Sequence, residues 1–488
     1  MYSSNKQGKN TKGFPDPLAK AEEKAMQEYG KQFAKAIENQ WGSASDSRSV
    51  FKNKKDTFVR SRKYANGTQD TTPYKKLLTS LDPNGNTGTL LNLDYTPVPI
   101  LPKFAKIVVN NILSRNPQPN VEAIDPLSSS QKDIEKKKIE ASVMAKKELM
   151  KLKENGLEIN GDPNDIPETL EEAEIFMGTS VKTDAEIAAQ VGTMMTLEWN
   201  DFNDNILRRC VNDLVACGMA VVKRNNDPNY GIKTEYVDPA NFVHSYTEDP
   251  SMNDLVYAGH VKRISIQELK RIAGDQLTEK EYEKIAQKVS GKYGNDSSIL
   301  NYSFYNEVNG VTGYGYDEYM VDVLDFEFLG VDCIHFEEKQ SKHGNIGFYY
   351  KGYSYKEKHG SVYDRTAHQM NVETVYGGSY VLGCDYLFDY GRKKNIPKNV
   401  HDISKAKMSY SAVAVNMQEM CPKSLVDSCI GFADMLQITH LKIQQAIAKA
   451  KPDGLIIDIE GLENVQLGKG GELQPLELHD IYEQTGVF

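Results

Sequence analysis

The chain has 488 residues, a length that allows about two to four domains. A hydrophobic content of 39% and a charged content of 26% provide for folded cores and exclude a chain that is disordered throughout. The formal net charge of −10 argues against a protein whose main work is tight binding of nucleic acid, because such binding needs Lys and Arg to neutralise many phosphates.

The sequence indicates a soluble protein of a reducing compartment. No apolar run approaches the roughly 18–20 residues that a membrane helix needs, and the N-terminal MYSSNKQGKNTKG lacks the apolar core of a signal peptide. The six cysteines include no C-x-x-C pair and no spacing to histidine that is typical of a zinc site. We therefore expect reduced, mostly buried thiols in a cytosolic protein.

The first 180 residues predict mainly helices. After a polar tail over residues 1–13, alanine and aromatic residues at helical spacing predict a helix over 17–41. A polar, serine-rich stretch comes next without a predicted element, and YANGTQDTTPYKKLL is interpreted as a turn and a short helix. Further helices are predicted over 102–114, 129–155 and 169–176, the last two with the charge density of solvated faces.

Two pairs of residues have the spacing of helix capping boxes. Thr183 and Glu186 precede a helix, and a second helix over 204–216 leads to a short strand at 219–223. The stretch YVDPANFVHSYTEDPSMNDLVYAGHVKRISIQEL then predicts a strand, an acidic turn, a second strand and a helix capped by Ser265 and Glu268. Residues 277–290 are predicted to be helical.

The composition changes after residue 290. Residues 291–315 predict a loop, and the alternation over 319–336 predicts a long strand. The next seventy residues, rich in Tyr, Gly, Lys and His, predict short strands with tight turns in a small β domain. A basic turn at Arg392, Lys393 and Lys394 is open to two interpretations, a solvated hairpin tip or a contact with phosphate or an acidic partner.

The most informative element is a helix expected over 422–451, about 45 Å long. Pro422 suits its first turn, and Pro452 and Gly454 are expected to end it. A surface helix needs apolar residues on one side only, whereas this one is apolar on two sides, as expected in a bundle or a ring of like helices. One stripe contains Leu425, Cys429, Phe432, Leu436, Ile443, Ile447 and Ala450, the second contains Val426, Ile430, Ala433 and Leu441, and a narrow charged stripe contains Asp427, Asp434, Lys442 and Lys449.

No stretch of the sequence carries a catalytic motif. Lys469 lies between glycines but lacks the spacing and the Ser or Thr of a phosphate-binding loop, which favours a hairpin turn, and Ser379 lacks the glycine that a nucleophile elbow requires. Asp322, Asp325 and Glu327 form the best acidic cluster for a metal, but alternation along a strand places Asp322 on the opposite face. We expect no cofactor and no metal.

The order of elements resembles the portal proteins of tailed bacteriophages, close to those of crAss-like phages. The resemblance lies in YANGTQDTTPYKKLL, PKFAKIVVNNILSRNPQPNVEAIDP, PETLEEAEIFM, EYVDPANFVHSYTEDPSMNDLVYAGHVKRISIQELK, GSYVLGCDYLFDYG and KPDGLIIDIEGLENVQLGKGGELQPLELHDIYEQTGVF. These pieces span most of the chain, and the Val-Asp-Pro-x-Asn-Phe stretch is the most specific among them. None is a catalytic signature, so the resemblance is one of architecture.

The resemblance implies an α+β fold of portal type. It implies a mainly helical wing with mixed β segments over 14–330, a small β-rich clip over 333–405, a stem over 406–451 with the long helix, and a return to the wing over 452–488. A crown or barrel is expected beyond the given chain. The channel or the contact between stems is assigned to Lys442, Lys449, Asp427 and Asp434, and stem packing to Leu425, Phe432, Leu436, Ile443 and Ile447.

The resemblance also implies partners and a location. Portal proteins form a ring, usually of twelve copies, at one capsid vertex, where double-stranded DNA passes during packaging and ejection. The partners are then the major capsid protein, the terminase motor and the head–tail connector or tail proteins, in a virion assembled in the bacterial cytoplasm, without a membrane or an enzymatic activity. Two alternatives stay open: a metal-dependent nucleic-acid enzyme using Asp322, Asp325 and Glu327, and a different head–tail adaptor ring.

Overall fold

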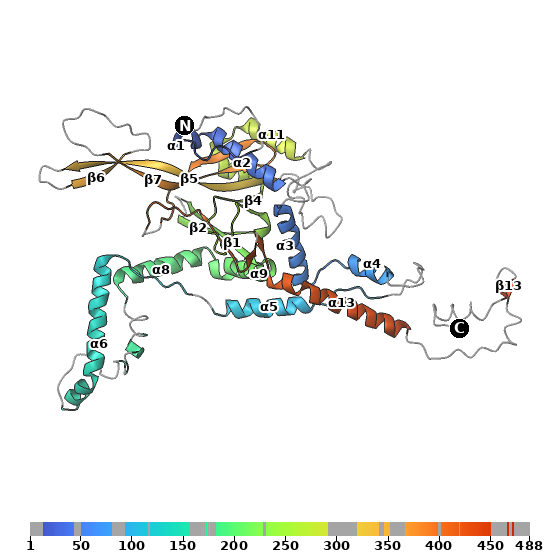
Figure 1. Cartoon of the computed structure of the whole chain (residues 1–488), viewed down its shortest axis with the longest axis horizontal. Coiled ribbons are helices and arrows are strands. Elements are labelled where there is room, and N and C mark those ends of the chain that lie inside the picture. Colours follow the sequence, from blue (N-terminus) through green and yellow to red (C-terminus); the bar gives the residue numbers. More distant parts are fainter. Residues whose placement is uncertain are drawn as a thin grey trace. The chain divides into compact units, whose positions relative to one another are not determined.

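A computed structural model describes most of the chain (Figure 1). The described residues are 13–42, 50–80, 93–115, 118–155, 182–227, 231–290, 320–340, 346–351, 367–398, 402–418 and 420–449, with short pieces between 167 and 175 and at 466–467 and 471–472. The predicted loop over 291–315, residues 170, 174 and 176 of the predicted helix over 169–176, and Pro452 and Gly454 lie outside them.

The fold is mixed α+β. About half of the described residues lie in helices and about a quarter in strands, and every described strand pairing is antiparallel. The chain divides into two compact units, the first formed by residues 1–111, 210–225 and 235–488 and the second by 112–209 and 226–234. In the described part, no helix is long and apolar enough to cross a membrane.

The largest sheet of the first unit is organised around one long strand. β5 (Met320–Gln340) pairs with β4 (Tyr257–Ser265) and β6 (Ile346–Lys351) along one edge and with β7 (Ala367–Val381) along the other. β3 (Phe242–His244) pairs with β4, and β8 (Tyr386–Arg392) pairs with β7, which completes the order β3-β4-β5-β7-β8. The predicted strand over 319–336 is confirmed and extends to residue 340.

Helices cover both faces of this sheet, which explains why β5 is apolar at successive positions. Leu324, Phe326 and Phe328 pack with α2 (Gln27–Gly42), where Phe33 stacks on Phe328 at 4.2 Å between ring centroids. The alternate residue Val323 packs with α10 (Ile266–Ala273) and α11 (Glu279–Ser290). The predicted helix over 17–41 is therefore present as α2, preceded by the single turn α1 (Ala21–Lys24).

A second, three-stranded sheet lies mostly in the same unit, apart from the part of its hairpin at 226–234, which is assigned to the second unit. The order of this sheet is β2 (Gly231–Val237), β1 (Met219–Asp227) and β9 (Tyr410–Ala414), and Met219 is opposite Ala414 in the ladder. Its core includes Phe58 of α3 (Val50–Asn66) and Cys217 of α9 (Arg208–Cys217). α3 begins at the end of the serine-rich stretch, in a part of the chain where the sequence predicted no element. The helix predicted over 204–216 begins instead as a π-helix at Phe202–Leu207.

The remaining elements of the first unit are mostly short, apart from the long helix α13. They are α4 (Thr72–Ser80), the 3-10 turns η3 (Pro239–Asn241) and η4 (Gly274–Gln276), the pair β10 (Met417–Gln418) and β11 (Cys421–Pro422), α13 (Leu425–Lys449), and the pair β12 (Gln466–Leu467) and β13 (Gly471–Glu472). The pairing of β12 with β13 confirms the hairpin that was predicted around Lys469. α5 (Ile100–Leu113) continues into the second unit.

The second unit is mainly helical, with α6 (Pro126–Glu154) and α8 (Asp184–Trp199). The capping box predicted at Thr183 and Glu186 is present, with both reciprocal hydrogen bonds. The buried Glu186 carboxylate also accepts from the Ala123 backbone N–H at 2.8 Å and from Lys132 at 3.0 Å. These donors, the backbone N–H groups foremost, lower the pKa of Glu186 to about 2.

The boundary that was expected between a wing and a clip falls inside β5. Residues 330–333 continue the strand without interruption, and β7 pairs with β5 from Val323 to Glu337, across that position. The described structure therefore has no break there, because one hydrogen-bonded ladder joins the two sides.

An unusual lysine lies in the core of the smaller sheet. Lys54 of α3 is buried, and its Nζ lies 2.9 Å from Nε2 of the buried His244. His244 Nδ1 is 2.8 Å from the carbonyl oxygen of Ser245, so Nδ1 carries the ring proton and Nε2 accepts from Lys54. Burial lowers the pKa of Lys54 to about 7, and the thiols of Cys421 and Cys217 offset this effect only in part.

We predict that Lys54→Met removes a pH dependence of stability. The pKa of Lys54 is about 7 in the folded chain and near 10.5 when unfolded, so between these values the unfolded chain binds one more proton. Stability of the natural chain should therefore rise with pH in this window, by up to about 1.4 kcal/mol per unit. Urea unfolding from pH 7 to 10 measures this slope, and Lys103→Met, an exposed lysine of α5, serves as control. An unchanged slope in the Lys54 variant contradicts the prediction.

Candidate assembly surface

α13 begins at Leu425, three residues later than expected. The side chain of Ser424 accepts a hydrogen bond from the Asp427 backbone N–H at 2.8 Å, which is the geometry of an N-cap. Pro422 is not in the first turn: it lies in β11, opposite Met417 of β10. The Ser424 cap explains why α13 starts later than expected. The serine side chain satisfies a free backbone N–H of the first turn, whereas a proline in the first turn adds no such hydrogen bond.

The two apolar stripes of α13 have different surroundings. Val426, Ile430 and Leu441 of the second stripe are at most 4% exposed, because the same protomer covers them. Every large residue of the first stripe is exposed, from 40% at Leu436 to 72% at Phe432. The exposed set is Leu425, Phe432, Leu436, Ile443 and Ile447, joined by Met435, which the sequence reasoning did not single out. The expectation that both sides face other copies is therefore wrong for the second stripe.

Buried polar contacts fix the inner side of α13. Asp434 accepts hydrogen bonds from the hydroxyl groups of Tyr64 in α3, at 2.6 Å, and Tyr74 in α4, at 2.5 Å. Burial, followed by the contact with Asp434, raises the pKa of both tyrosines, so they remain neutral donors. Asp434 was expected to face a channel or a neighbouring stem. The structure places its carboxylate against the helices of its own protomer instead.

A second set of contacts ties α13 to the extended segment before α5. The fully buried Gln437 accepts from the Val98 backbone N–H at 2.8 Å and donates to the Thr96 carbonyl oxygen at 3.3 Å. Two turns further, Gln444 accepts from the Asp94 backbone N–H at 3.1 Å. These amide side chains satisfy backbone groups of a segment outside any strand, and they set the rotation of the helix about its axis.

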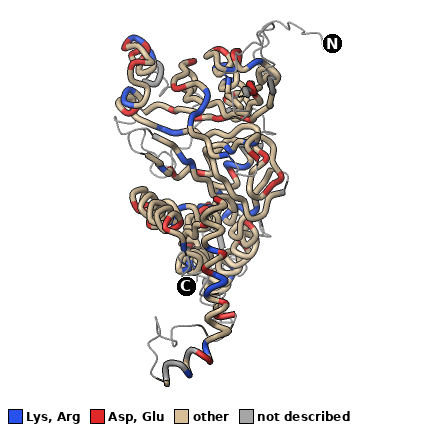
Figure 2. Tube along the Cα trace, turned by 90° about the vertical axis from the view of Figure 1, so that its left-hand side faces the viewer, with Lys and Arg blue, Asp and Glu red and all other residues tan. Residues whose placement is uncertain are grey.

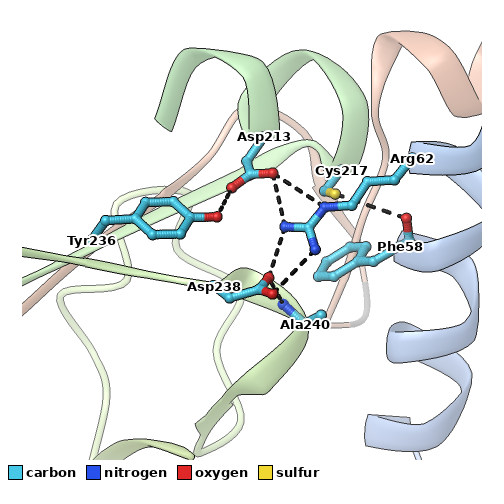
Figure 3. Close-up of polar contacts among 7 residues, drawn as sticks. All are labelled: Phe58, Arg62, Asp213, Cys217, Tyr236, Asp238 and Ala240. Carbon is cyan, nitrogen blue, oxygen red and sulfur yellow. Dashed lines mark hydrogen bonds and ion pairs between the residues drawn. The ribbon is translucent and has the colours of Figure 1, made fainter. Parts of the chain in front are cut away.

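α3 is in turn held by an arginine between two carboxylates (Figure 3). Arg62 Nη2 donates to Asp213 of α9 at 2.8 Å and to Asp238 at 2.7 Å, and Nη1 adds a second bond to Asp238 at 3.2 Å. Asp213 also accepts from Tyr236 of β2, and Asp238 accepts from the Ala240 backbone N–H at 3.0 Å. One guanidinium therefore joins α3, α9 and the end of β2.

The thiol beside this arginine is buried and unreactive. Cys217 Sγ lies 4.0 Å from the carbonyl oxygen of Phe58, and burial, only partly offset by the cation of Arg62, raises its pKa to about 12. Protonated thiols are poor nucleophiles and poor metal ligands. The other five cysteines are also free thiols, but Cys210 is the only buried one among them, so the expectation of mostly buried thiols is wrong.

The other predicted site residues of α13 differ in how far they are exposed. Asp427 is half-buried in the first turn, and Lys442 is exposed beside Ile443. Lys449 is the last residue of α13, and its side chain lies outside the described part. The four charged positions keep the helical spacing of one stripe, and Asp434 differs from Lys442 in that it contacts its own protomer.

The acidic cluster of β5 is committed to contacts within the protomer. Asp325 pairs with the buried Lys223, and burial, which alone would raise its pKa, is outweighed by Lys223 and its neighbours, so the pKa is lowered. Glu327 accepts from the Ser409 backbone N–H at 2.9 Å, and Asp322 lies 4.0 Å from Arg263. Among the described residues no group of three or more His, Cys, Asp or Glu is arranged to hold a metal ion.

The basic turn lies where β8 ends. The Lys393 backbone N–H donates to the carbonyl oxygen of Val375 at 2.8 Å, and Lys393 Nζ is 3.8 Å from Asp389. Arg392 and Lys394 are exposed on either side. Along the rest of the described trace, residues of both signs are intermingled (Figure 2).

No protein-family model matches the sequence, and no curated protein matches it either.

We predict that Arg62→Gln lowers the free energy of unfolding by about 2–4 kcal/mol, because it leaves the mostly buried Asp213 without its cation. Arg62→Lys should cost less, since it keeps the charge and loses only the forked geometry. Urea unfolding by circular dichroism measures both values. Arg60→Gln, on the exposed side of α3, is the matched control and should change stability by less than about 1 kcal/mol. Equal losses at positions 60 and 62 would contradict a specific role for this ion pair.

Proposed function

We propose that the chain is the subunit of a ring-shaped portal of a tailed bacteriophage, set at one vertex of the capsid. The observation that carries the proposal is the exposed apolar stripe of α13, from Leu425 to Ile447, on a helix whose other side is locked to its own protomer. The sequence resemblance to portal proteins supports the same conclusion. The alternative of a metal-dependent enzyme has less support, because Asp325 and Glu327 are engaged by partners within the protomer.

The exposed stripe has the dimensions of a protein interface. It extends over 23 positions of α13, about 33 Å along the axis. Each large apolar side chain that becomes covered contributes about 1.5–3 kcal/mol, and six such residues on one face form a patch of the kind that marks interaction sites. A partner helix of the next copy would cover it.

The covered inner side of α13 leaves one side for contact with another copy. The inner stripe already contacts α3, so a neighbour has access to the outer stripe alone, and in a ring it meets this stripe with a different surface. Such a head-to-tail contact closes into a ring when its rotation divides a full turn. In this proposal residues 14–330 form the wing, 333–405 the clip and 406–451 the stem of a portal-type fold, with about twelve copies, and the ladder of β5 and β7 joins wing and clip without a break.

The net charge fits a channel through which DNA slides. Subunits of charge −10 repel the duplex and keep it away from the wall, while a few basic positions guide it. The proposed partners are the double-stranded DNA in transit, the major capsid protein, the terminase motor and the head–tail connector or tail proteins. The proposed location is the virion, after assembly in the bacterial cytoplasm.

We predict that Phe432→Asp combined with Ile447→Asp abolishes the ring, because both residues are about 70% exposed and a buried carboxylate in the contact is costly. Native mass measurement and class averages should then show monomers, with thermal unfolding of the monomer unchanged. The matched control places Asp at Leu127 and Met144 of α6, which are 78% and 75% exposed, and should keep the ring. Rings of normal size in the α13 variant would contradict the proposal, and class averages of another fold and symmetry would favour an adaptor ring.

We also predict that Lys442→Glu with Lys449→Glu keeps the ring and changes the length of packaged DNA or the rate of ejection. The reason is that Lys442 is exposed beside the apolar stripe, where a basic position can guide phosphates. Packaged length is measured on DNA from purified particles, and Lys137→Glu with Lys138→Glu on α6 is the charge-matched control. Loss of the ring in the α13 variant would place these lysines in the contact between copies.

A further inference from the structure

A hollow of about 530 Å³ lies beside the basic turn, within a single protomer. Its walls are Glu373 and Thr374 of β7, Arg392 at the end of β8, the turn from Lys393 to Ile396, and the residues Lys398 and Ala406. This volume is in the range of small-molecule sites. The hollow is separate from α13, and its chemistry does not depend on ring formation.

The charges around the hollow are unbalanced. Arg392, Lys393, Lys394 and Lys398 line it together with one carboxylate, Glu373, and Asp389 lies 3.8 Å from Lys393 Nζ, so four cations minus two anions leave an excess of two positive charges. The whole chain has a net charge of −10, so the positive charge of this concave region is opposite in sign to that of the protein. The excess of cations creates a local positive potential, and concave walls strengthen such a field.

The neutral and acidic groups of the lining already have partners inside the protomer. The Glu373 carboxylate accepts from the Ala406 backbone N–H at 3.0 Å, and the Thr374 hydroxyl donates to the carboxylate of Asp332 at 2.6 Å. Lys398 donates one bond to the Ile403 carbonyl oxygen at 3.0 Å, and its ammonium group has three donors in all. A ligand would therefore meet the cations first.

The turn itself brings these cations to the rim of the hollow. Asn395 adopts the left-handed conformation with φ 57°, which Asn tolerates better than most residues. The chain can therefore reverse tightly just after Lys393 and Lys394, and both residues line the hollow.

The cations are close enough to repel one another. Partial burial and then the positive charge of Arg392 lower the pKa of Lys398. Cations that are crowded in this way gain when an anion enters, because phosphate oxygens accept charge-assisted hydrogen bonds from several of them at once.

We propose that this hollow binds a compact ligand with several phosphate groups. The concave, bounded shape favours a small polyphosphate over a nucleic-acid duplex, because an extended duplex would also meet the net negative surface of the subunit. Arg392 and Lys394 bind the ligand from the rim, and Lys398 binds it from the far side of the turn. The negative charge of Glu373 repels the phosphate groups of the ligand and limits the affinity.

Isothermal titration of the full chain with sodium tripolyphosphate tests the proposal, and inorganic phosphate and a short DNA duplex form separate arms. Tripolyphosphate should bind, more tightly at low salt, and inorganic phosphate more weakly. Arg392→Gln with Lys394→Gln should weaken binding by about tenfold or more. Lys137→Gln with Lys138→Gln, which changes the net charge equally on α6, should leave it unchanged.

Glu373→Gln provides a test in the opposite direction. It removes the opposing charge and keeps an oxygen that accepts from the Ala406 N–H, so binding should tighten by about threefold. A misfolded variant cannot produce tighter binding, so this result does not depend on the fold of the double variant. The proposal is overturned if tripolyphosphate does not bind, if the α6 control weakens binding equally, or if the duplex alone binds.

Discussion

The contact between Arg62 and the two carboxylates of Asp213 and Asp238 is the constraint on which the rest of the first unit depends. It joins a helix from the N-terminal part of the chain to a helix and a strand about 151 to 176 residues later. Burying such charges costs free energy unless their hydrogen bonds are satisfied, and here Tyr236 and the Ala240 N–H complete them. The result is a defined position for α3, against which α13 packs.

Because one side of α13 is attached rigidly to its own protomer, the other side of the helix keeps a fixed direction. Asp434, Gln437 and Gln444 fix the rotation of the helix by hydrogen bonds whose partners lie in the same protomer. The exposed Phe432 and Ile447 therefore point in one direction, as an interface requires. The inner side of α13 carries its own buried apolar residues and polar contacts, and the large apolar residues on the outer side are additional to these, which is the starting point of our proposal of a ring.

Local patterns in the sequence predicted strands and helix caps well, but they did not predict which helices pack against one another. The alternation around Phe326 predicted β5, and the spacing of Thr183 and Glu186 predicted a capping box with both bonds. α3 was missed because its inner face carries lysines such as Lys54, so the helical period of apolar residues is weak there. Both stripes of α13 are apolar, and only the position of α3 shows which stripe is inside. The basic turn was recognised from its three consecutive cations, whereas Glu373 joins it only through the fold.

The uninterrupted course of β5 has a mechanical consequence. Its 21 residues extend about 70 Å, and β7 pairs with Val323 to Glu337 along one edge, while β4 and β6 pair with the two ends of β5 along the other. Bending the strand at residue 331 would strain its hydrogen bonds to β7. A force applied to β5 at the end near β6 would therefore be transmitted along the β5–β7 ladder to β4 and to the helices that pack on the sheet.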